Sequence, residues 1–185
     1  MPSGTLVILS GPSGVGKDTI IDAWQKLNPQ VVRVVACTTR APRENEINGH
    51  DYHFLTKEDF ELKINNDHFL EYKKVHENYY GTPSDQVDQL LNLGKIAILK
   101  IDVQGALEVM AKKPEILSIF LLPPSTQELE RRLTSRKTDS PEQVQIRLTT
   151  ALQEIEQSAK YKYQVVNENI MSAVEQLEQI VSNHS

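Results

Sequence analysis

Ser10-Gly11-Pro12-Ser13-Gly14-Val15-Gly16-Lys17-Asp18-Thr19 is the stretch that decides the fold. An apolar run, Leu6–Leu9, precedes it, and an amphipathic segment follows it. Glycines at this spacing let the backbone curl so that successive N–H groups and a helix N-terminus point at an anion, and a lysine adds positive charge for the outer phosphates. The G-x-x-x-x-G-K spacing therefore predicts a phosphate-binding P-loop, made of Gly11, Ser13, Gly14, Val15, Gly16, Lys17, Asp18 and Thr19.

One position departs from the P-loop pattern. The motif has Ser or Thr after its lysine, and that hydroxyl binds Mg²⁺. This chain has Asp18 there, and a threonine only at the next residue. Because a carboxylate is also a magnesium ligand, Asp18 is our candidate metal ligand.

The composition limits the class of protein. With 185 residues, of which 39% are hydrophobic and 24% charged, the chain is expected to form one globular domain. A net charge of −5 argues against nucleic acid as a partner. The single cysteine, Cys37, excludes an internal disulfide and reads as a small buried hydrophobe. We find no apolar run of membrane-spanning length and no room for a signal peptide before the first strand, so we expect a cytoplasmic protein without a membrane partner.

Five apolar runs alternate with helix-period segments, which predicts a parallel sheet flanked by helices. The expected strands are Leu6–Ser10, Val31–Ala36, Ile96–Asp102, Ile116–Leu122 and Tyr163–Val166. The first helix begins at Lys17 and is stopped by Asn28-Pro29. A closing helix places Ile170, Val174, Leu177, Ile180 and Val181 on one face.

Two segments interrupt this alternation. Residues 37–83 are polar, carry the turn signal Asn48-Gly49 and mix short strands with a helix near residues 57–66, which predicts an inserted substrate-binding subdomain. Residues 125–160 read as two helices joined by a polar turn, which predicts a helical lid rich in arginine. The core is then expected over residues 1–36, 84–124 and 161–185.

The predicted insert is dense in groups that recognise a phosphorylated small molecule. Arg40 and Arg43 flank Pro42, and two guanidinium groups at this spacing can fork onto one phosphate, although solvated surface arginines are an equal alternative. Tyr52 and Tyr80 add hydroxyl groups. Glu71 follows an apolar pair, and its carboxylate can accept two hydrogen bonds from the N–H edge of a purine. The neighbouring Lys73-Lys74 is interpreted as part of a solvated face.

Six ordered blocks across the chain resemble the guanylate kinase family. They are Gly11–Lys17, Thr38–Arg43, Glu46–Tyr52, Tyr79–Gly81, Ile101–Gly105 and Val166-Asn167. The resemblance implies a P-loop kinase fold with a GMP-binding insert and a lid. It assigns Arg40, Arg43, Tyr52 and Tyr80 to the GMP phosphate and Glu71, Thr82 and Asp102 to the guanine edge. It places the lid arginines Arg132, Arg136 and Arg147 with Lys17 at the transferred phosphoryl group and Asn167 beside the adenine of ATP.

The activity implied by this resemblance is transfer of the γ-phosphoryl group of ATP to GMP, with dGMP as a second acceptor, giving GDP and ADP in purine nucleotide metabolism. Mg²⁺ and ATP would be required, GMP and ATP would be the only partners, and the protein would be a monomer or a homodimer. Positioning and charge stabilisation supply most of the catalysis in such a reaction, and no general base is needed.

Three positions depart from the family pattern. Asp18 replaces Ser, Thr or Gly, Lys100 stands where an acidic residue is common, and Ala36 stands where a serine hydroxyl often reaches guanine. The first two changes are opposite in charge, so we hypothesise that they compensate, either as an ion pair beside the metal or with Asp18 on Mg²⁺ and Lys100 on a phosphate. The alternative is a lysine extended into solvent and an aspartate that caps the helix.

Two other functions stay open at this point. A kinase of a sugar phosphate such as ribose 1,5-bisphosphate is favoured by Asp18, because P-loops of that group also read Gly-Lys-Asp. The intact Asn48–Tyr52 block and Glu71 argue against it, since a substrate without a purine does not need them. A catalytically silent binding module of guanylate-kinase type is disfavoured by Lys17 and the lid arginines, because a pure binding module has no need to hold ATP.

Overall fold

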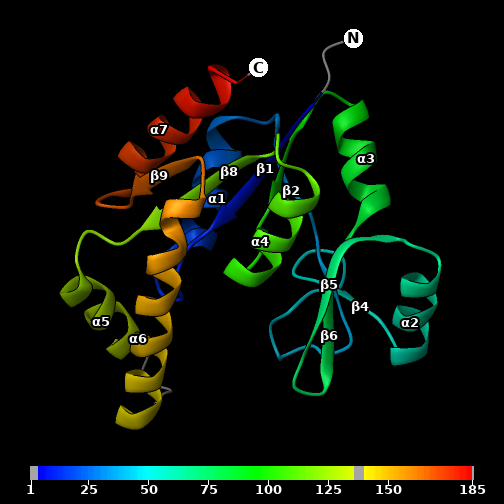
Figure 1. Cartoon of the computed structure of the whole chain (residues 1–185), viewed down its shortest axis with the longest axis horizontal. Helices are drawn as coiled ribbons and strands as arrows, with labels where there is room; N and C mark the ends of the chain where they lie inside the picture. The colour runs from blue at the N-terminus through cyan, green and yellow to red at the C-terminus, as the bar shows by residue number, and fades with distance from the viewer. Residues whose placement is uncertain (1–3, 136–139, 185) are drawn as a thin grey trace.

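The computed structural model describes residues 4–135 and 140–184. Its larger sheet is parallel throughout, and the P-loop leaves its central strand (Figure 1). In spatial order the strands are β2 (Val31–Arg33), β7 (Ile96–Leu99), β1 (Thr5–Ser10), β8 (Leu117–Leu122) and β9 (Tyr163–Val166). The order reverses at β1, and ligands of open parallel sheets bind at such a reversal, beyond the carboxyl ends of the strands.

Helices cover both faces of this sheet. Alternate residues of a strand point to opposite faces, so Val7 and Leu9 of β1 pack into one core and Ile8 into the other. The first core is closed by α1 (Lys17–Leu27) and α7 (Ile170–Ser182), and the second by α3 (Ser84–Asn92) and α4 (Val103–Lys112). Trp24 of α1 is fully buried and donates its indole N–H to Glu178 of α7, which satisfies its one polar group.

A second, four-stranded sheet lies beside the larger one (Figure 1). Its order is β4 (His53–Phe54), β3 (Cys37–Thr38), β6 (Asn78–Pro83) and β5 (Phe69–Val75), and α2 (Lys57–Asn65) packs against it. Phe60 of α2 is fully buried and stacks on Phe69 and Tyr79, with ring centroids 4.4 and 5.2 Å apart. These aromatic contacts attach α2 to the sheet.

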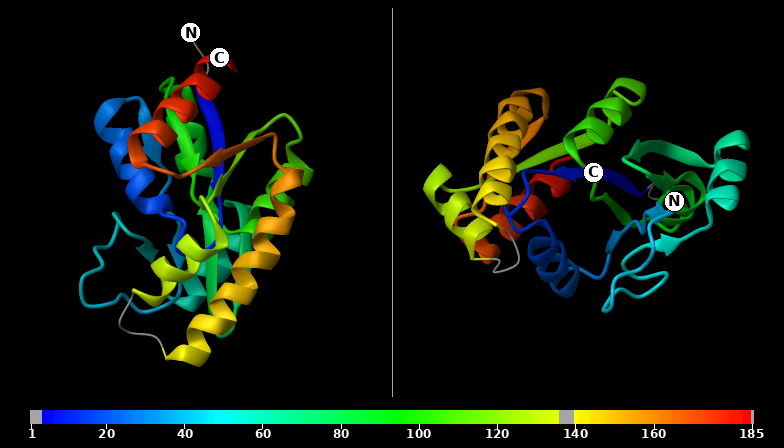
Figure 2. Two further views of the ribbon diagram at one scale, coloured as in Figure 1. Left: turned by 90° about the vertical axis from the view of Figure 1, so that its left-hand side faces the viewer. Right: turned by 90° about the horizontal axis from the view of Figure 1, so that it is seen from below.

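Two helices, α5 (Thr126–Thr134) and α6 (Pro141–Glu156), project from the other end of the sheet, and a short 3₁₀ helix (Gln157–Lys160) leads back into β9 (Figure 2). The start of α6 is specified locally, because Ser140 and Gln143 form a capping box and Pro141 occupies the first turn. Leu129, Leu133, Leu148 and Ala151 form a small core between the two helices. No helix within the described ranges is long and apolar enough to cross a membrane.

The structure confirms the parallel sheet with helices on both faces, and it corrects two strand ends. The run from Val31 to Ala36 is not one strand, because β2 ends at Arg33 and the chain then passes into the smaller sheet at Cys37. The run ending at Asp102 is also shorter, because the Asp102 carboxylate accepts the Gly105 N–H and caps α4. The division into core, insert and lid stays a prediction.

Candidate active site

The P-loop joins β1 to α1. Gly14 and Gly16 have φ of 86° and 97°, a left-handed backbone that favours glycine and turns the chain into the helix. The Lys17 ammonium folds back over the loop and donates to the carbonyl oxygens of Gly11 at 2.5 Å and Pro12 at 3.1 Å. The P-loop therefore has its turned conformation, and the Lys17 ammonium lies against the backbone of the loop.

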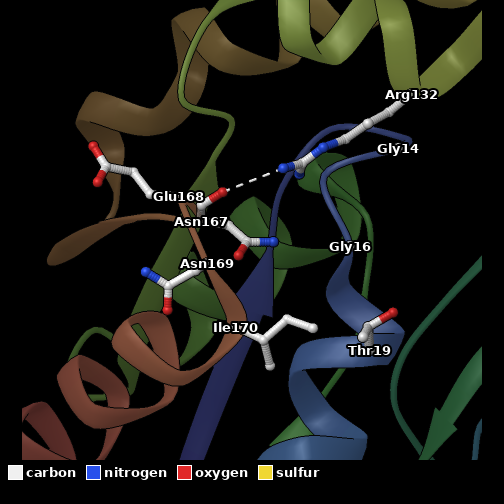
Figure 3. A pocket seen from close by; sticks show the side chains of 8 residues that line it. All are labelled: Gly14, Gly16, Thr19, Arg132, Asn167, Glu168, Asn169 and Ile170. Carbon is white, nitrogen blue, oxygen red and sulfur yellow. Dashed lines mark hydrogen bonds between the residues drawn. The ribbon is translucent and has the colours of Figure 1, made fainter.

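A first cavity, of about 450 Å³, opens between the P-loop and the start of α7 (Figure 3). Asn167 is 5% exposed, and its side-chain amide donates to the carbonyl oxygen of Val15 at 2.8 Å. This bond ties the loop before α7 to the P-loop. The residues that line the cavity are Gly14, Gly16, Thr19, Arg132, Asn167, Glu168, Asn169 and Ile170.

Two of the predicted lid arginines reach the P-loop. Arg132 donates to the carbonyl oxygens of Val15 at 3.3 Å and Asn167 at 3.5 Å, and Arg147 donates to the Ser13 hydroxyl at 2.7 Å. Glu128 holds Arg132 from the same helix, and hydrogen bonds from Arg131 and Arg132 lower the pKa of Glu128 to about 2. Arg136, the third predicted member, lies outside the described residues.

A second cavity, of about 400 Å³, is lined by Lys17 and lies between the P-loop and the smaller sheet. It brings together groups that lie far apart in the sequence. Its charged and hydroxyl-bearing lining residues are Ser13, Lys17, Tyr52, Glu71, Lys73, Tyr80, Lys100, Asp102 and Glu154, and Ala36 also lines it. We call this space the acceptor cavity.

Two carboxylates meet in the acceptor cavity. Glu71 is 5% exposed and accepts the Thr82 hydroxyl at 2.6 Å; burial raises the pKa of its carboxyl group, against the opposing effects of the Thr82 hydrogen bond and the Lys73 charge. A Cβ atom on Gly105 would lie 3.1 Å from Glu71 Oε2 and 3.4 Å from Asp102 Oδ1. Both carboxylates therefore converge on the start of α4, where glycine leaves room for them.

Arg40, Tyr52 and Tyr80 form the opposite part of the site. The Arg40 guanidinium makes a bidentate ion pair with Glu46, at 2.8 and 2.9 Å, and lies 5.5 Å from the centre of the Tyr52 ring. The Tyr52 and Tyr80 rings are 6.1 Å apart. Arg43 is not brought into this group: its side chain is exposed, and only its backbone N–H binds Glu46, at 2.8 Å.

The charge-swapped positions form an ion pair. Lys100 Nζ lies 2.5 Å from Asp18 Oδ1, and Arg33 binds the same oxygen at 3.4 Å. Arg33 also donates to the carbonyl oxygen of His50 at 2.6 Å, which links α1 to the predicted insert. The capping interpretation of Asp18 is wrong, because Gly16 is the N-cap of α1 and has no side chain to cap it.

Sequence analysis missed Lys73 and Glu154. The interpretation of Lys73 as part of a solvated face is wrong, because its side chain is only 21% exposed and pairs with Asp102. The alternation of side chains along a strand could have indicated its position, since Lys73 is two residues from Glu71 and therefore shares its face. Glu154 of α6 enters the cavity from a distant helix, and no local pattern marks it; burial raises the pKa of its carboxyl group against the attraction of Lys17.

Comparisons with known proteins agree with this geometry. The guanylate kinase family model matches residues 3–184. A guanylate kinase of Clostridium perfringens is 46% identical over 178 residues, which cover 96% of this chain and 82% of that protein, and one of Clostridium tetani is 46% identical over 182 residues, covering 98% and 87%. The crystal structure of guanylate kinase from Anaplasma phagocytophilum matches with a TM-score of 0.77 at 33% identity, covering 99% of this chain and 87% of that one.

Proposed function

The chain belongs to the guanylate kinase family, and from that premise we propose how its residues carry out the reaction. The enzyme transfers the γ-phosphoryl group of ATP to GMP, giving GDP and ADP. Relatives that are 41–46% identical over nearly the whole chain favour neither the sugar phosphate kinase nor the silent binding module. The observation that carries the proposed site is the pair of cavities that both border the P-loop, one for each nucleotide.

ATP is the phosphoryl donor and is proposed to occupy the first cavity and the P-loop. The backbone N–H groups of Ser13 to Thr19 and the Lys17 ammonium would bind its phosphates, since a helix N-terminus and a lysine both favour an anion. Asn167 would lie beside the adenine, as the lining of the first cavity supports.

GMP is proposed to occupy the acceptor cavity. Arg40, Arg43, Tyr52 and Tyr80 would hold its phosphate, and the exposed side chain of Arg43 would then have to turn inward. The guanine edge presents N–H donors at positions 1 and 2, which match the acceptors Glu71 and Asp102, with Thr82 holding Glu71 in place. Because none of these groups is assigned to the ribose 2′-hydroxyl, dGMP is proposed as a second acceptor.

The transfer itself depends on charge. Lys17, Arg132 and Arg147 meet at the P-loop between the two cavities, and Arg136 is the further candidate by resemblance. Positive groups placed around the transferred phosphoryl group stabilise the charge that spreads over its oxygens, and one such arginine is worth ~10³-fold or more in rate. Water must be excluded from this space, because it competes with GMP as the acceptor.

Mg²⁺ is proposed as the metal, with Asp18 as its protein ligand. The Asp18 side chain is 63% exposed at the start of α1, and Lys100 and Arg33 both bind its Oδ1 atom. No group of three or more His, Cys, Asp or Glu suited to a metal occurs among residues 4–135 and 140–184. This fits an ion that needs only one or two carboxylates because phosphates supply other ligands. Bound there, Mg²⁺ would neutralise charge on the phosphates.

ADP release from Mg-ATP, measured with a panel of acceptors, tests the function. The panel is GMP, dGMP, IMP, AMP, UMP, ribose 1,5-bisphosphate and no acceptor. We expect fast turnover with GMP and dGMP and loss of ~10³-fold in the Lys17→Met variant. Turnover only with the sugar bisphosphate, or silence with every acceptor from a folded protein, would contradict the proposal.

The cytoplasmic location and the monomeric or homodimeric state stay predictions. Light scattering after size-exclusion chromatography gives the mass to compare with the 21.0 kDa chain.

A further inference from the structure

Lys73 lines the acceptor cavity together with groups assigned to the base and groups assigned to the phosphate. In the pairing of β5 with β6, Glu71 lies opposite Thr82, and Lys73 lies opposite Tyr80. Its side chain is 21% exposed, and its ammonium pairs with the Asp102 carboxylate. A cation therefore neutralises one of the two carboxylates that would read the purine.

The two carboxylates consequently differ in character. Glu71 has its Oε1 atom bound by the Thr82 hydroxyl and its Oε2 atom next to Gly105, with no cation bound to it among the described residues. Asp102 has Oδ1 bound by the Gly105 N–H at 2.9 Å and Oδ2 bound by Lys73. Burial lowers the pKa of Lys73, but the nearby Glu71, Glu108 and Glu154 oppose that shift and favour the charged form.

The pairing has a consequence for the purine ring. A carboxylate can only accept hydrogen bonds, so it matches an N–H group of the base, whereas an ammonium can only donate them, so it matches a carbonyl oxygen. Guanine, hypoxanthine and xanthine share the N1–H donor, which Glu71 can accept, and they differ at position 2. Guanine has an amino group there, xanthine a carbonyl oxygen and hypoxanthine a hydrogen atom. Asp102 with Lys73 presents an acceptor and a donor side by side.

We propose that Lys73 is a specificity-determining residue that lets the enzyme accept XMP as well as GMP, by donating to the 2-carbonyl of xanthine where Asp102 accepts from the 2-amino group of guanine. The proposal rests on the proposed function, because it takes the acceptor cavity as the purine site. Hypoxanthine engages neither group, so IMP is expected to be the poorest of the three acceptors. Loss of a hydrogen bond to a charged group is worth about tenfold or more, and this is the scale of the expected preference for XMP over IMP.

The test is kcat/KM for GMP, IMP and XMP in the wild type and in Lys73→Met, Lys73→Arg and Lys74→Met. Lys74 is the matched control, since it is exposed on the opposite face of β5, 5.9 Å from the Tyr79 ring. We expect the ratio of XMP to IMP to fall about tenfold in Lys73→Met, to be kept at least in part in Lys73→Arg and to stay unchanged in Lys74→Met. Lys73→Met also removes the cation from Asp102, so the XMP and IMP values are each compared with kcat/KM for GMP in the same variant.

Two results would overturn the proposal: a wild type that uses IMP better than XMP, or an XMP to IMP ratio that Lys73→Met leaves unchanged. The first needs no variant, so it decides the question even if Lys73→Met does not fold. Calorimetric binding of the three monophosphates to the wild type separates this proposal from the proposed function. Absence of GMP turnover would contradict the kinase, whereas binding of XMP no tighter than IMP would contradict the role of Lys73.

Discussion

The ion pair between Asp18 and Lys100 predicts a specific non-additivity. Asp18→Ser leaves Lys100 and Arg33 without their carboxylate, close to the phosphate site, and Lys100→Asp places a second carboxylate beside Asp18. Each single change should lower kcat/KM for GMP. The double change places a hydroxyl at position 18 and a single carboxylate at position 100, so it should restore part of the loss.

The structure sets the size of this coupling. At 2.5 Å, two unit charges attract by ~1.7 kcal/mol when screened as in water. The side chains are 28% and 63% exposed, and exposed pairs measure only about 0.2–1 kcal/mol after the entropy of holding them is subtracted. Arg33 lies 3.4 Å from the same Asp18 oxygen, so the Asp18→Ser change also removes the attraction between Asp18 and Arg33. We therefore expect a coupling of ~1 kcal/mol, about fivefold in rate.

The assay is steady-state GMP phosphorylation at saturating Mg-ATP for the four proteins of the cycle, with urea unfolding of the same proteins as a second readout. The double variant should exceed the product of the single effects by about fivefold. Effects that add within ~0.3–0.5 kcal/mol would refute the compensation, because independent sites behave in that way. Unfolding data show whether a loss of activity comes only from a loss of stability.

Three further predictions concern single residues. Burial raises the pKa of Glu71 above its ordinary value, so KM for GMP should rise as pH falls through that raised pKa, and Glu71→Gln should raise KM and remove that dependence. The folded state holds this proton more tightly than the unfolded chain does, so the Glu71 contribution to stability is present at low pH and is lost as pH rises through the raised pKa, which urea unfolding at each pH measures. Burial raises the pKa of Cys37 to about 11, so a thiol reagent at about pH 8 should leave the native protein unmodified and label one thiol in denaturant; fast labelling of the native state would contradict the buried position. Gly16→Ala should lower the free energy of unfolding by about 1–2 kcal/mol, because Gly16 has a φ of 97°. It should also weaken ATP binding, because the added Cβ would lie 3.0 Å from Asn167 Nδ2. Gly49→Ala is the control: with a φ of 81° and open space around its Cβ, it should lower stability and leave ATP binding unchanged.

Local patterns predicted the parts of the fold that depend on local chemistry. The P-loop follows from the glycine spacing, and the strand predicted over Tyr163–Val166 agrees with β9 over its full length. The end of β2 was missed because it depends on where a second sheet recruits Cys37, a contact between distant segments. The strand that ends at Asp102 was made too long for a similar reason, since its apolar pattern continues into a helix cap.

The candidate site shows the same limit in its charges. The opposite charges of Asp18 and Lys100 lead to two hypotheses from the sequence, an ion pair or separate contacts to Mg²⁺ and a phosphate. Only the fold, which brings α1 to the end of β7, shows that the two side chains form the ion pair. Lys73 was placed in solvent because neighbouring lysines suggest a polar face, while the strand alternation puts the two on opposite sides. Arg40 and Arg43 were treated as equivalent. In the structure Glu46 binds the guanidinium of Arg40 but the backbone N–H of Arg43.

The lysines of the acceptor cavity each have a carboxylate partner, which stabilises the site before its substrates bind. Three lysines line one cavity, and a carboxylate from a different helix faces each: Asp18 of α1 pairs with Lys100, Asp102 at the start of α4 pairs with Lys73, and Glu154 of α6 attracts Lys17. Without these partners the lysines would repel one another in a half-buried space. When two nucleotides bind, their phosphates would replace carboxylates as partners of the lysines. Binding would therefore not require lysines that are unpaired in the free enzyme. Because Glu154 and Arg147 belong to the same helix, α6 supplies both the carboxylate that attracts Lys17 and the arginine that binds Ser13 of the P-loop.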